Sequence, residues 1–301
     1  MKVALTGASG FLGPVVGQRL VERGHTVHVL ARDVKRTLAR LPQGVSGSFF
    51  DAATPLSPDA LGGAEAVVHL AGEPVAQRWT EAARQRIRDS RVVGTRLLVE
   101  ALRAAGTVRH FVSASAIGYY GAWRGAEPLT ESSAPGEDFL AGVCRAWEAE
   151  ALQAATAGIR TVVPRIGVVL HPEGGALKKM LPPFRLGLGG RMGSGQQYLS
   201  WVHREDTLGL LLFALEHPEL SGPLNVTAPE PATNADFSRV LGTALGRPAV
   251  MPVPSFALKA ALGEMSEVVL GGQRALPRRA QEAGYRFQFP TLPEALHSLL
   301  G

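Results

Sequence analysis

Short apolar runs alternate with longer amphipathic stretches through the first two thirds of the chain. Seven runs are short and uniformly apolar, as buried parallel strands are, and they lie at residues 3–6, 26–31, 47–50, 66–71, 110–114, 161–165 and 199–203. Apolar residues recur at helical spacing over 11–23, 80–105 and 138–157. Repeated strand–helix–strand units with right-handed crossovers predict an α/β fold, a doubly wound parallel sheet of the Rossmann type.

The pattern changes after Leu170. Clusters of glycine and proline interrupt any regular period up to about residue 197, and we expect loops there, over the carboxyl edge of the sheet. A helical pattern returns at 235–245 and 254–270. We therefore predict a dinucleotide-binding Rossmann domain over residues 1–170, with its sheet completed by 198–228. Residues 171–197 and 229–301 would form substrate-side loops and a small C-terminal lobe.

Composition places the chain among ordinary globular proteins. Its 301 residues are 46% hydrophobic and 19% charged, which excludes wholesale disorder, collagen and coiled coil. The formal net charge of +5 comes mainly from arginines that are spread along the chain without a basic block, so we expect an anionic small ligand rather than nucleic acid. No apolar run approaches the roughly 20 residues of a membrane helix, so we expect no membrane partner.

Cysteine and histidine usage bears on compartment and metal binding. The single cysteine, Cys144, can form neither an intramolecular disulfide nor a thiolate metal cluster, which favours a reducing, cytoplasmic location. No His-Glu-x-x-His or Cys-x-x-Cys spacing occurs, so we predict no metal site. His69 and His203 end predicted strands, and we interpret both as hydrogen-bonded structural residues rather than proton carriers.

A glycine-rich turn joins the first predicted strand to the first predicted helix. Gly7 would allow the tight turn, Gly10 the close approach of the backbone to a pyrophosphate, and Gly13 the packing of helix on strand. The N-terminus of the helix would face the anion. We therefore predict dinucleotide binding. The other contributors from the turn are Thr6, Ser9, Phe11 and Leu12.

The end of the second strand distinguishes the two nicotinamide dinucleotides. An acidic residue there would bind the ribose hydroxyls of NAD, and a basic one would pair with the 2′-phosphate of NADP. The chain has Arg32 followed by Asp33, and the guanidinium fork of Arg32 favours NADP. The alternative is that Arg32 is a solvated loop residue and that Asp33 is the ribose ligand.

Further cofactor candidates follow the later strands. Asp51, after the third strand, would either face the adenine or cap its own loop. The residues directly after the fourth strand, Leu70 to Gly72, would line the nicotinamide side, and Glu73 would cap the cofactor or the substrate. An arginine that ends the sixth strand would meet an anionic group of the cofactor or substrate. In chain order these candidates are Asp51, Leu70, Ala71, Gly72, Glu73 and Arg165.

Longer motifs carry a resemblance to a known family. The chain resembles the extended short-chain dehydrogenase/reductases, in their NAD-dependent epimerase/dehydratase-like branch, and more narrowly an atypical epimerase-like subfamily with a C-terminal domain of unknown function. Some members of this subfamily were once labelled cell-division inhibitors. The resemblance runs nearly end to end, implies NADP (NADPH) binding and is compatible with a homodimer, but it implies no particular substrate. The motifs are Thr6–Gly13, His69-Leu-Ala-Gly72, Asp89-Ser-Arg91, Ser113-Ala-Ser-Ala-Ile-Gly-Tyr-Tyr-Gly121, Ser200-Trp-Val-His-Arg-Glu-Asp206 and Gln273-Arg274.

The resemblance also implies where catalytic residues should stand. In the wider family a Tyr-x-x-x-Lys pair on the helix after the fifth strand transfers a proton, and a serine or threonine of that strand polarises the reacting oxygen. Residues four apart share a helix face, which lets the lysine lower the pKa of the tyrosine. Ser115 stands at the serine position. Counting back from Glu148, Leu140 falls at the tyrosine position and Cys144 at the lysine position, and neither can substitute directly.

Three interpretations of the catalytic machinery remain open. Tyr119 or Tyr120, just beyond Ser115, could be the acid in a reduction or could simply cover the end of the strand. Cys144 could be a nucleophile or a buried, inert thiol. The protein could also bind NADPH without chemistry, as a regulator or redox sensor.

We expect an NADP-binding, epimerase-like oxidoreductase that acts on an unidentified polar or anionic small molecule. Basic residues flank the glycine-rich stretch in which related epimerases seat their substrate. An anionic substrate would suit these side chains, although a solvated charged surface would explain them as well. They are Arg165, Lys178, Lys179, Arg185 and Arg191.

Overall fold

A parallel sheet of eight strands forms the centre of the molecule. The computed structural model describes all 301 residues. The strands of the sheet are β1 (Lys2–Thr6), β2 (Thr26–Ala31), β3 (Ser46–Phe49), β4 (Ala66–His69), β5 (His110–Ser113), β6 (Ser115–Ala116), β8 (Arg160–Ile166) and β12 (Gly222–Val226). They lie in the order β12-β8-β5-β4-β1-β2-β3, with the short β6 also paired to β8. Every pairing in this sheet is parallel, as predicted.

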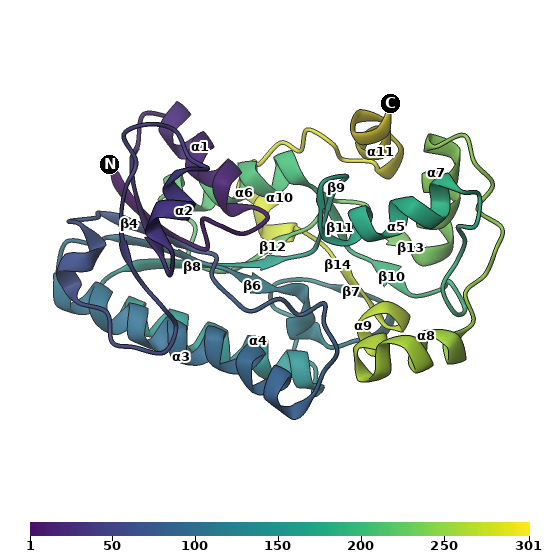
Figure 1. Cartoon of the computed structure of the whole chain (residues 1–301), viewed down its shortest axis with the longest axis horizontal. Coiled ribbons are helices and arrows are strands. Elements are labelled where there is room, and N and C mark those ends of the chain that lie inside the picture. Colours follow the sequence, from purple (N-terminus) through teal and green to yellow (C-terminus); the bar gives the residue numbers. More distant parts are fainter.

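Helices cover both faces of the sheet (Figure 1). The helices of this domain are α1 (Gly13–Glu22), α2 (Val34–Leu38), α3 (Glu81–Ala105), α4 (Phe139–Leu152) and α6 (Arg204–Glu216). Side chains of a strand point alternately to its two faces, so β1 contributes to two separate cores. Val3 and Leu5 join the core that α1 and α6 cover, whereas Ala4 joins the core that α3 and α4 cover. The predicted doubly wound α/β class is therefore confirmed.

The strand order places a crevice at the carboxyl ends of β1 and β4. From β1 the chain runs outward through β2 and β3 on one side, and then returns to build β4, β5 and β8 on the other. Loops that leave β1 and β4 diverge at this reversal, and ligands of doubly wound proteins bind there. The predicted starts of two long helices also hold, because Thr80 and Asp138 accept hydrogen bonds from the N–H groups of Ala83 and Ala141 as N-caps.

The predicted strand at 199–203 differs in the structure. It is divided at Ser200 into β10 (Tyr198–Leu199) and β11 (Trp201–His203), and neither joins the central sheet. β10 pairs with β13 (Ala232–Thr233), and β11 pairs with β9 (Val168–His171). The strand at this edge of the central sheet is instead β12. Its sequence begins with Gly222 and Pro223, which are unusual in strands, so the apolar pattern did not predict it. Proline is tolerated there because an edge strand has one side without a partner.

Two helical segments also differ from the predictions. Residues 171–197, expected as loops, contain α5 (Gly175–Arg185). Its buried Leu177, Leu181 and Phe184 have helical spacing, but Pro182 and Pro183 fall in its last turns and concealed the pattern. The single helix expected at 254–270 is two helices, α8 (Ser255–Leu262) and α9 (Ser266–Leu270), because the chain turns at Gly263 with φ +59°.

The C-terminal residues build a small lobe and then return to the first domain. In the lobe, α5, α7 (Asn234–Ala244) and α11 (Leu292–Leu300) share one apolar core with Trp201. Two elements that lie between α7 and α11 in the sequence contact the first domain. The strand β14 (Gly272–Ala275) pairs in parallel with β7 (Trp123–Leu129) (Figure 1). The helix α10 (Arg278–Glu282) packs on β12 and contributes Ala280 to the main core.

A buried carboxylate holds the segment after α10 against α6. Asp206 has no exposed surface, and it accepts hydrogen bonds from the N–H of Gln288 at 2.8 Å, the N–H of Phe289 at 2.9 Å and the hydroxyl of Tyr285 at 3.2 Å. Buried donors that lose their acceptor cost free energy. Asp206 is therefore the main polar anchor of this part of the tail.

We predict that Asp206→Ala lowers the free energy of unfolding by about 2–4 kcal/mol, because it leaves several buried donors unpaired. Urea denaturation followed by circular dichroism measures the change. The matched control is Asp59→Ala, since Asp59 is exposed and its side chain has no hydrogen-bond partner; this control should change stability by less than about 0.5 kcal/mol. Equal effects of the two substitutions would show that Asp206 is no anchor.

Candidate functional site: the crevice above the glycine turn

The glycine turn packs directly against the end of β4. Gly7 has φ +70°, and a Cβ at this position would lie 2.6 Å from the carbonyl carbon of Leu70. A Cβ on Gly13 would overlap the carbonyl oxygen of Gly7, and the N–H of Gly10 donates to that same oxygen at 2.9 Å. These contacts demand glycine at positions 7 and 13 for backbone reasons alone.

No capping side chain accepts a hydrogen bond from the N–H groups in the first turn of α1. Its N-cap is Leu12, which has no side-chain oxygen, and Pro14 follows at the start of the helix. The unpaired N–H groups of a helix N-terminus attract anions. The preceding Phe11 points toward the later part of the chain, since a Cβ on Gly174 would overlap its ring. Phe11 thereby links the turn to the start of α5.

A chain of hydrogen bonds fixes the loop after β4 beneath the turn. Thr6 Oγ1 accepts from the N–H groups of Leu70 and Ala71 at 3.1 and 3.2 Å, so its own hydrogen goes to His69 Nδ1 at 2.7 Å. His69 Nε2 then donates to Thr95 Oγ1 at 3.0 Å. Burial lowers the pKa of His69 to about 3, so the ring is neutral and structural, as we expected.

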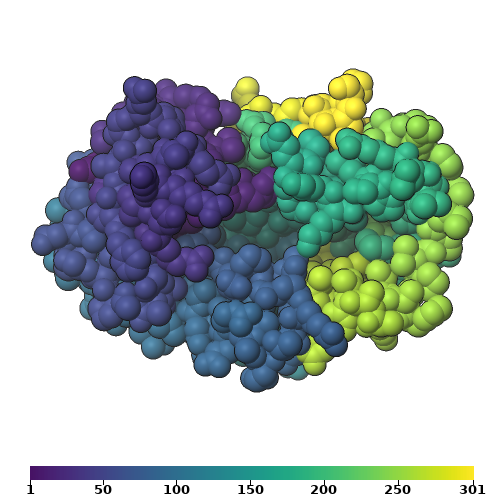
Figure 2. Space-filling view, in the orientation of Figure 1, coloured from purple at the N-terminus to yellow at the C-terminus, as the bar shows by residue number.

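Most predicted cofactor residues meet in one cleft of about 310 Å³ above these contacts. Nine of the fourteen line it; Thr6 and Gly13 lie beneath, while Phe11, Leu12 and Arg165 are also absent from the lining. Figure 2 shows the surface hollowed between the N-terminal residues, in purple, and later segments in teal and green. The lining residues are Gly7, Ser9, Gly10, Leu30, Ala31, Arg32, Phe50, Asp51, Ala52, Leu70, Ala71, Gly72, Glu73, Pro74 and Ser90.

The two charged residues after β2 have different surroundings. Asp33 is the N-cap of α2 and accepts from the N–H of Arg36 at 2.9 Å. Arg32 is exposed, lines the cleft and has no hydrogen-bond partner in the protein. Arg40, which the sequence analysis missed, reaches the same region and donates to the carbonyl oxygen of Ser9 at 2.6 Å. The free guanidinium at this end of the cleft is therefore that of Arg32.

Asp51 caps its own loop, which is one of the two roles that its position suggested. Its Oδ1 accepts from the N–H of Ala53 at 3.0 Å and from the N–H and hydroxyl of Thr54 at 2.8 Å each, so it caps its own loop. These hydrogen bonds lower the pKa of Asp51. Asp51 also lines the cleft, and its other oxygen accepts no hydrogen bond from the protein.

Ser115 belongs to a buried network rather than to the cleft lining. Its hydroxyl donates to Glu148 Oε1 at 2.7 Å, and Glu148 also accepts from Nε and Nη2 of Arg165, each at 2.8 Å. The three residues are at most 5% exposed. An ionised carboxylate has no proton to give, so the hydrogen of Ser115 is committed to Glu148 and its oxygen is left as an acceptor.

Arg165 is held on the same carboxylate. Burial alone would lower the pKa of its guanidinium, but the hydrogen bonds and charge of Glu148 outweigh this and raise it. Nη1 donates to the hydroxyl of Tyr120 and to the carbonyl oxygen of Glu131, so four of the five N–H donors of Arg165 are engaged within the protein. The structure does not bring Arg165 together with the other cofactor candidates.

The two candidate tyrosines face different surroundings. Tyr120 has no exposed surface, its hydroxyl donates to Asn225 Oδ1 at 2.7 Å, and burial raises its pKa to about 12. Tyr119 is partly exposed, and the Cζ atom of Arg165 lies 3.5 Å from the centre of its ring. Of the two candidate acids, Tyr119 alone is therefore in contact with solvent.

Cys144 is a buried thiol. Its Sγ lies beside the loop after β5, at 3.7 Å from the place of a Cβ on Gly118. Burial, reinforced by the charge of Glu148, raises its pKa to about 12. This agrees with the inert thiol of the sequence analysis rather than with the nucleophile.

The other titratable candidates lie outside the cleft. His203 accepts from the N–H of Glu205 as the N-cap of α6, and burial lowers its pKa to about 4. Of the five basic residues predicted to flank the glycine-rich stretch, Arg165 is buried, and the other four are exposed on α5 and the loop after it. No helix combines the length and apolar character needed to cross a membrane, and no group of three or more acidic, histidine or cysteine side chains is placed to hold a metal ion.

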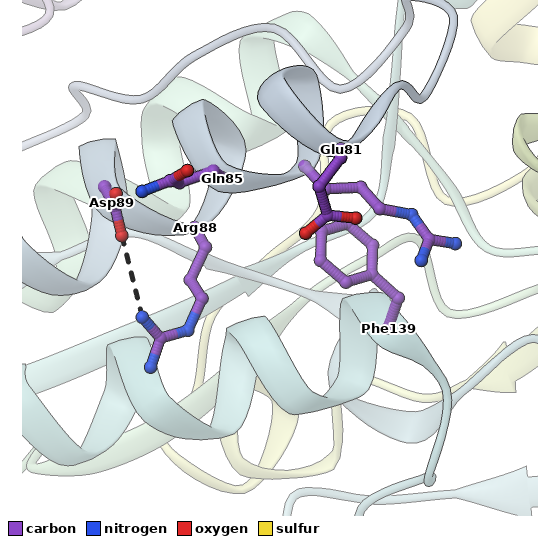
Figure 3. Close-up of a pocket in the computed structure, with 6 residues that line it drawn as sticks. Glu81, Gln85, Arg88, Asp89 and Phe139 are labelled. Atoms are coloured by element: carbon purple, nitrogen blue, oxygen red, sulfur yellow. Dashed lines mark ion pairs between the residues drawn. The ribbon is translucent and has the colours of Figure 1, made fainter.

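A second pocket lies between the N-terminal turns of α3 and α4 (Figure 3). Its volume is also about 310 Å³, and none of the cofactor candidates lines it. Arg88 is paired with Asp89 at 3.6 Å, and the Cζ of Arg84 lies 5.0 Å from the centre of the Phe139 ring. Arg84 is paired with Glu264 outside the pocket, and none of the predicted site residues lies here, so we assign the pocket no role. The lining is Glu81, Arg84, Gln85, Arg88, Asp89 and Phe139.

The crevice and the glycine turn define a dinucleotide-binding α/β protein of the extended short-chain dehydrogenase/reductase type. Residues 3–227 match the NAD dependent epimerase/dehydratase family, and residues 253–299 match a C-terminal domain of unknown function (DUF1731). The chain belongs to the NAD dependent epimerase/dehydratase family, which confirms the resemblance found in the sequence.

Relatives resemble the chain over its whole length. An epimerase family protein of Mycobacterium leprae is 41% identical over 296 residues, which cover 98% of this chain and 94% of the relative. The crystal structure of human epimerase family protein SDR39U1 (isoform2) with NADPH has a TM-score of 0.86 and 36% identity, covering 100% of this chain and 99% of that one. The structure of MoeE5 in complex with UDP-glucose and NAD has a TM-score of 0.78 and 21% identity over 100% and 97% of the two chains, and it shares the fold.

We predict that Cys144 is almost unreactive in the native protein. With a pKa of about 12, on the order of one thiol in 10⁴ is ionised at pH 8, compared with roughly a quarter for a free cysteine. Iodoacetamide labelling followed by mass spectrometry should therefore be about a thousandfold slower in the native state than in urea. The control variant Ser57→Cys adds an exposed thiol that should react quickly. Similar rates for Cys144 in both states would contradict a buried, inert role.

Proposed function

We propose that this chain binds NADPH in the crevice above the glycine turn and acts as an NADP-dependent oxidoreductase on a polar or anionic small molecule. The observation that carries the proposal is the unpaired Arg32, which lines the same cleft as Ser9 and Gly10 of the glycine turn that leads into the uncapped N-terminus of α1. The former suits a 2′-phosphate and the latter a pyrophosphate. The human relative solved with NADPH, at 36% identity over nearly the whole of both chains, supports the choice of cofactor.

In this proposal Tyr119 is the acid of a carbonyl reduction. Bound NADPH would supply the hydride that adds to the carbonyl carbon. The carbonyl oxygen then needs one proton, which the partly exposed phenol of Tyr119 would donate, and solvent would return a proton to the phenolate. Ser115 would not donate a hydrogen bond to the carbonyl, because its own hydrogen lies on Glu148 and the residue is buried outside the cleft lining.

A second candidate function is a regulator or redox sensor that binds NADPH without reacting. One observation favours it: Ser115 and Tyr120, two of the three candidate catalytic groups, are buried and committed to partners inside the protein. If the chain is instead an oxidoreductase, the exposed cations Lys178, Lys179 and Arg185 of α5 would attract an anionic substrate. The two functions differ in whether any carbonyl compound is reduced.

We predict that Arg32→Ala weakens NADPH binding by about tenfold to a hundredfold, because a charge-assisted contact to the 2′-phosphate is lost. NADH has no such phosphate, so its affinity should change by less than about twofold. Isothermal titration calorimetry measures both constants. Arg36→Ala is the control, since Arg36 is exposed on α2, four residues after Arg32, but does not line the cleft. An unchanged preference between the two cofactors in Arg32→Ala would refute the phosphate assignment.

We predict that Tyr119→Phe lowers turnover by at least about a hundredfold, in the range of general acid catalysis, and leaves NADPH affinity unchanged. The assay is NADPH oxidation at 340 nm with a panel of phosphorylated and carboxylated aldehydes and ketones. Tyr198→Phe, a change at a tyrosine of β10, is the control and should retain activity. If the wild-type protein binds NADPH but reduces no compound of the panel, the non-catalytic function is favoured instead.

A further inference from the structure

A charged residue lies on the buried face of the long helix α3. Arg91 follows the buried Ile87 by one helical turn and precedes the buried Thr95 by another, so all three share one face. Arginine is seldom placed on such a face without a partner or a function. Its Nη1 donates to the carbonyl oxygens of Ile87 at 3.1 Å and Glu73 at 2.9 Å.

The guanidinium of Arg91 lies against the loop that lines the cleft. A Cβ on Gly72 would be 3.1 Å from its Cζ and 3.2 Å from its Nη2. Gly72 and Glu73 both line the cleft, directly after β4. The Nε and Nη2 atoms of Arg91 have no hydrogen-bond partner in the protein, and neither is sealed off from solvent. Arg91 is not itself part of the cleft lining, but its guanidinium packs directly against the lining residue Gly72 with two donor groups that no protein acceptor occupies.

The same guanidinium lies beside the position at which the wider family has its lysine. Its Cζ is 5.1 Å from the centre of the ring of Trp147, which is one turn along α4 from Cys144. Burial raises the pKa of Cys144, and the charge of Arg91 opposes that rise, so the two groups are close enough to interact. Arg91 of α3 therefore lies close to Cys144 of α4, the position at which the wider family has its lysine.

We propose that Arg91 supplies, from α3, the positive charge that a lysine on α4 supplies in the wider family, and that its free N–H groups hold the nicotinamide half of the cofactor. The inference rests on the proposed binding of NADPH. Arg32 and Asp51 follow β2 and β3 on one side of β1, whereas Gly72 and Arg91 lie on the β4 side. In a doubly wound fold the dinucleotide spans this reversal, so the two arginines engage its opposite halves.

The test compares NADPH with 2′,5′-ADP, a fragment that contains the adenosine half and its 2′-phosphate but no nicotinamide. We expect Arg91→Met, which keeps a long apolar side chain without the charge, to weaken NADPH binding by about tenfold or more. Binding of 2′,5′-ADP should change by less than about twofold, and it also reports that the variant is folded. Arg88→Met, on the exposed face of α3, is the matched control and should change neither constant.

Two further variants separate a binding role from a packing role. Arg91→Lys retains the charge and should keep NADPH affinity within about threefold of the wild type. Cys144→Lys in the Arg91→Met background restores the cation from α4 and should recover part of the lost NADPH affinity, while 2′,5′-ADP binding stays constant.

The outcomes distinguish this inference from the proposed function. Unchanged NADPH affinity in Arg91→Met, or an equal loss for NADPH and 2′,5′-ADP, would overturn the role of Arg91 and leave NADPH binding intact. Failure of the wild-type protein to bind NADPH would overturn the proposed function, and this inference with it.

Discussion

The buried ion pair between Arg165 and Glu148 organises the region in which this family conducts its chemistry. Two charges withdrawn from water are costly, and here two hydrogen bonds of 2.8 Å and further partners offset that cost. The pair joins β8 to α4 and also engages Ser115, Tyr120 and Tyr119. Removal of either partner would leave a buried charge, so the whole loop after β5 depends on this contact. Glu148 lies one helical turn beyond Cys144, the position of the lysine in the wider family, so this ion pair adjoins the positions at which that family has its catalytic pair.

The cofactor half of the site could be predicted from the sequence because its determinants are local. A strand, a glycine turn and a helix follow one another within a few residues, and the same backbone contacts that fix the turn demand glycine at positions 7 and 13. Arg32 could be distinguished as the phosphate candidate by its place at the end of β2. The structure adds what the sequence left open, namely that Asp33 is occupied as a helix cap.

The catalytic half could not be predicted in the same way, because its state depends on contacts between distant residues. The proton of Ser115 is directed by Glu148, which lies 33 positions away. Tyr119 and Tyr120 are neighbours in sequence, yet Tyr120 joins a small core with Leu129 and Ala275 while Tyr119 remains at its margin. Arg91 could have been noticed as a charge on an otherwise buried helix face, but only the fold shows that it adjoins Gly72. Helix α5 was hidden because its prolines outweighed a clear apolar spacing.

The return of the tail to the first domain has a consequence for how the chain folds during synthesis. Domains made on the ribosome usually fold in order from the N-terminus. Here β7 has its partner in β14, and the main core needs Ala280 of α10, so residues near the end of the chain complete structures that begin near its start. The main core of the first domain therefore gains its last residue, and β7 its strand partner, only after nearly the whole chain has been synthesised.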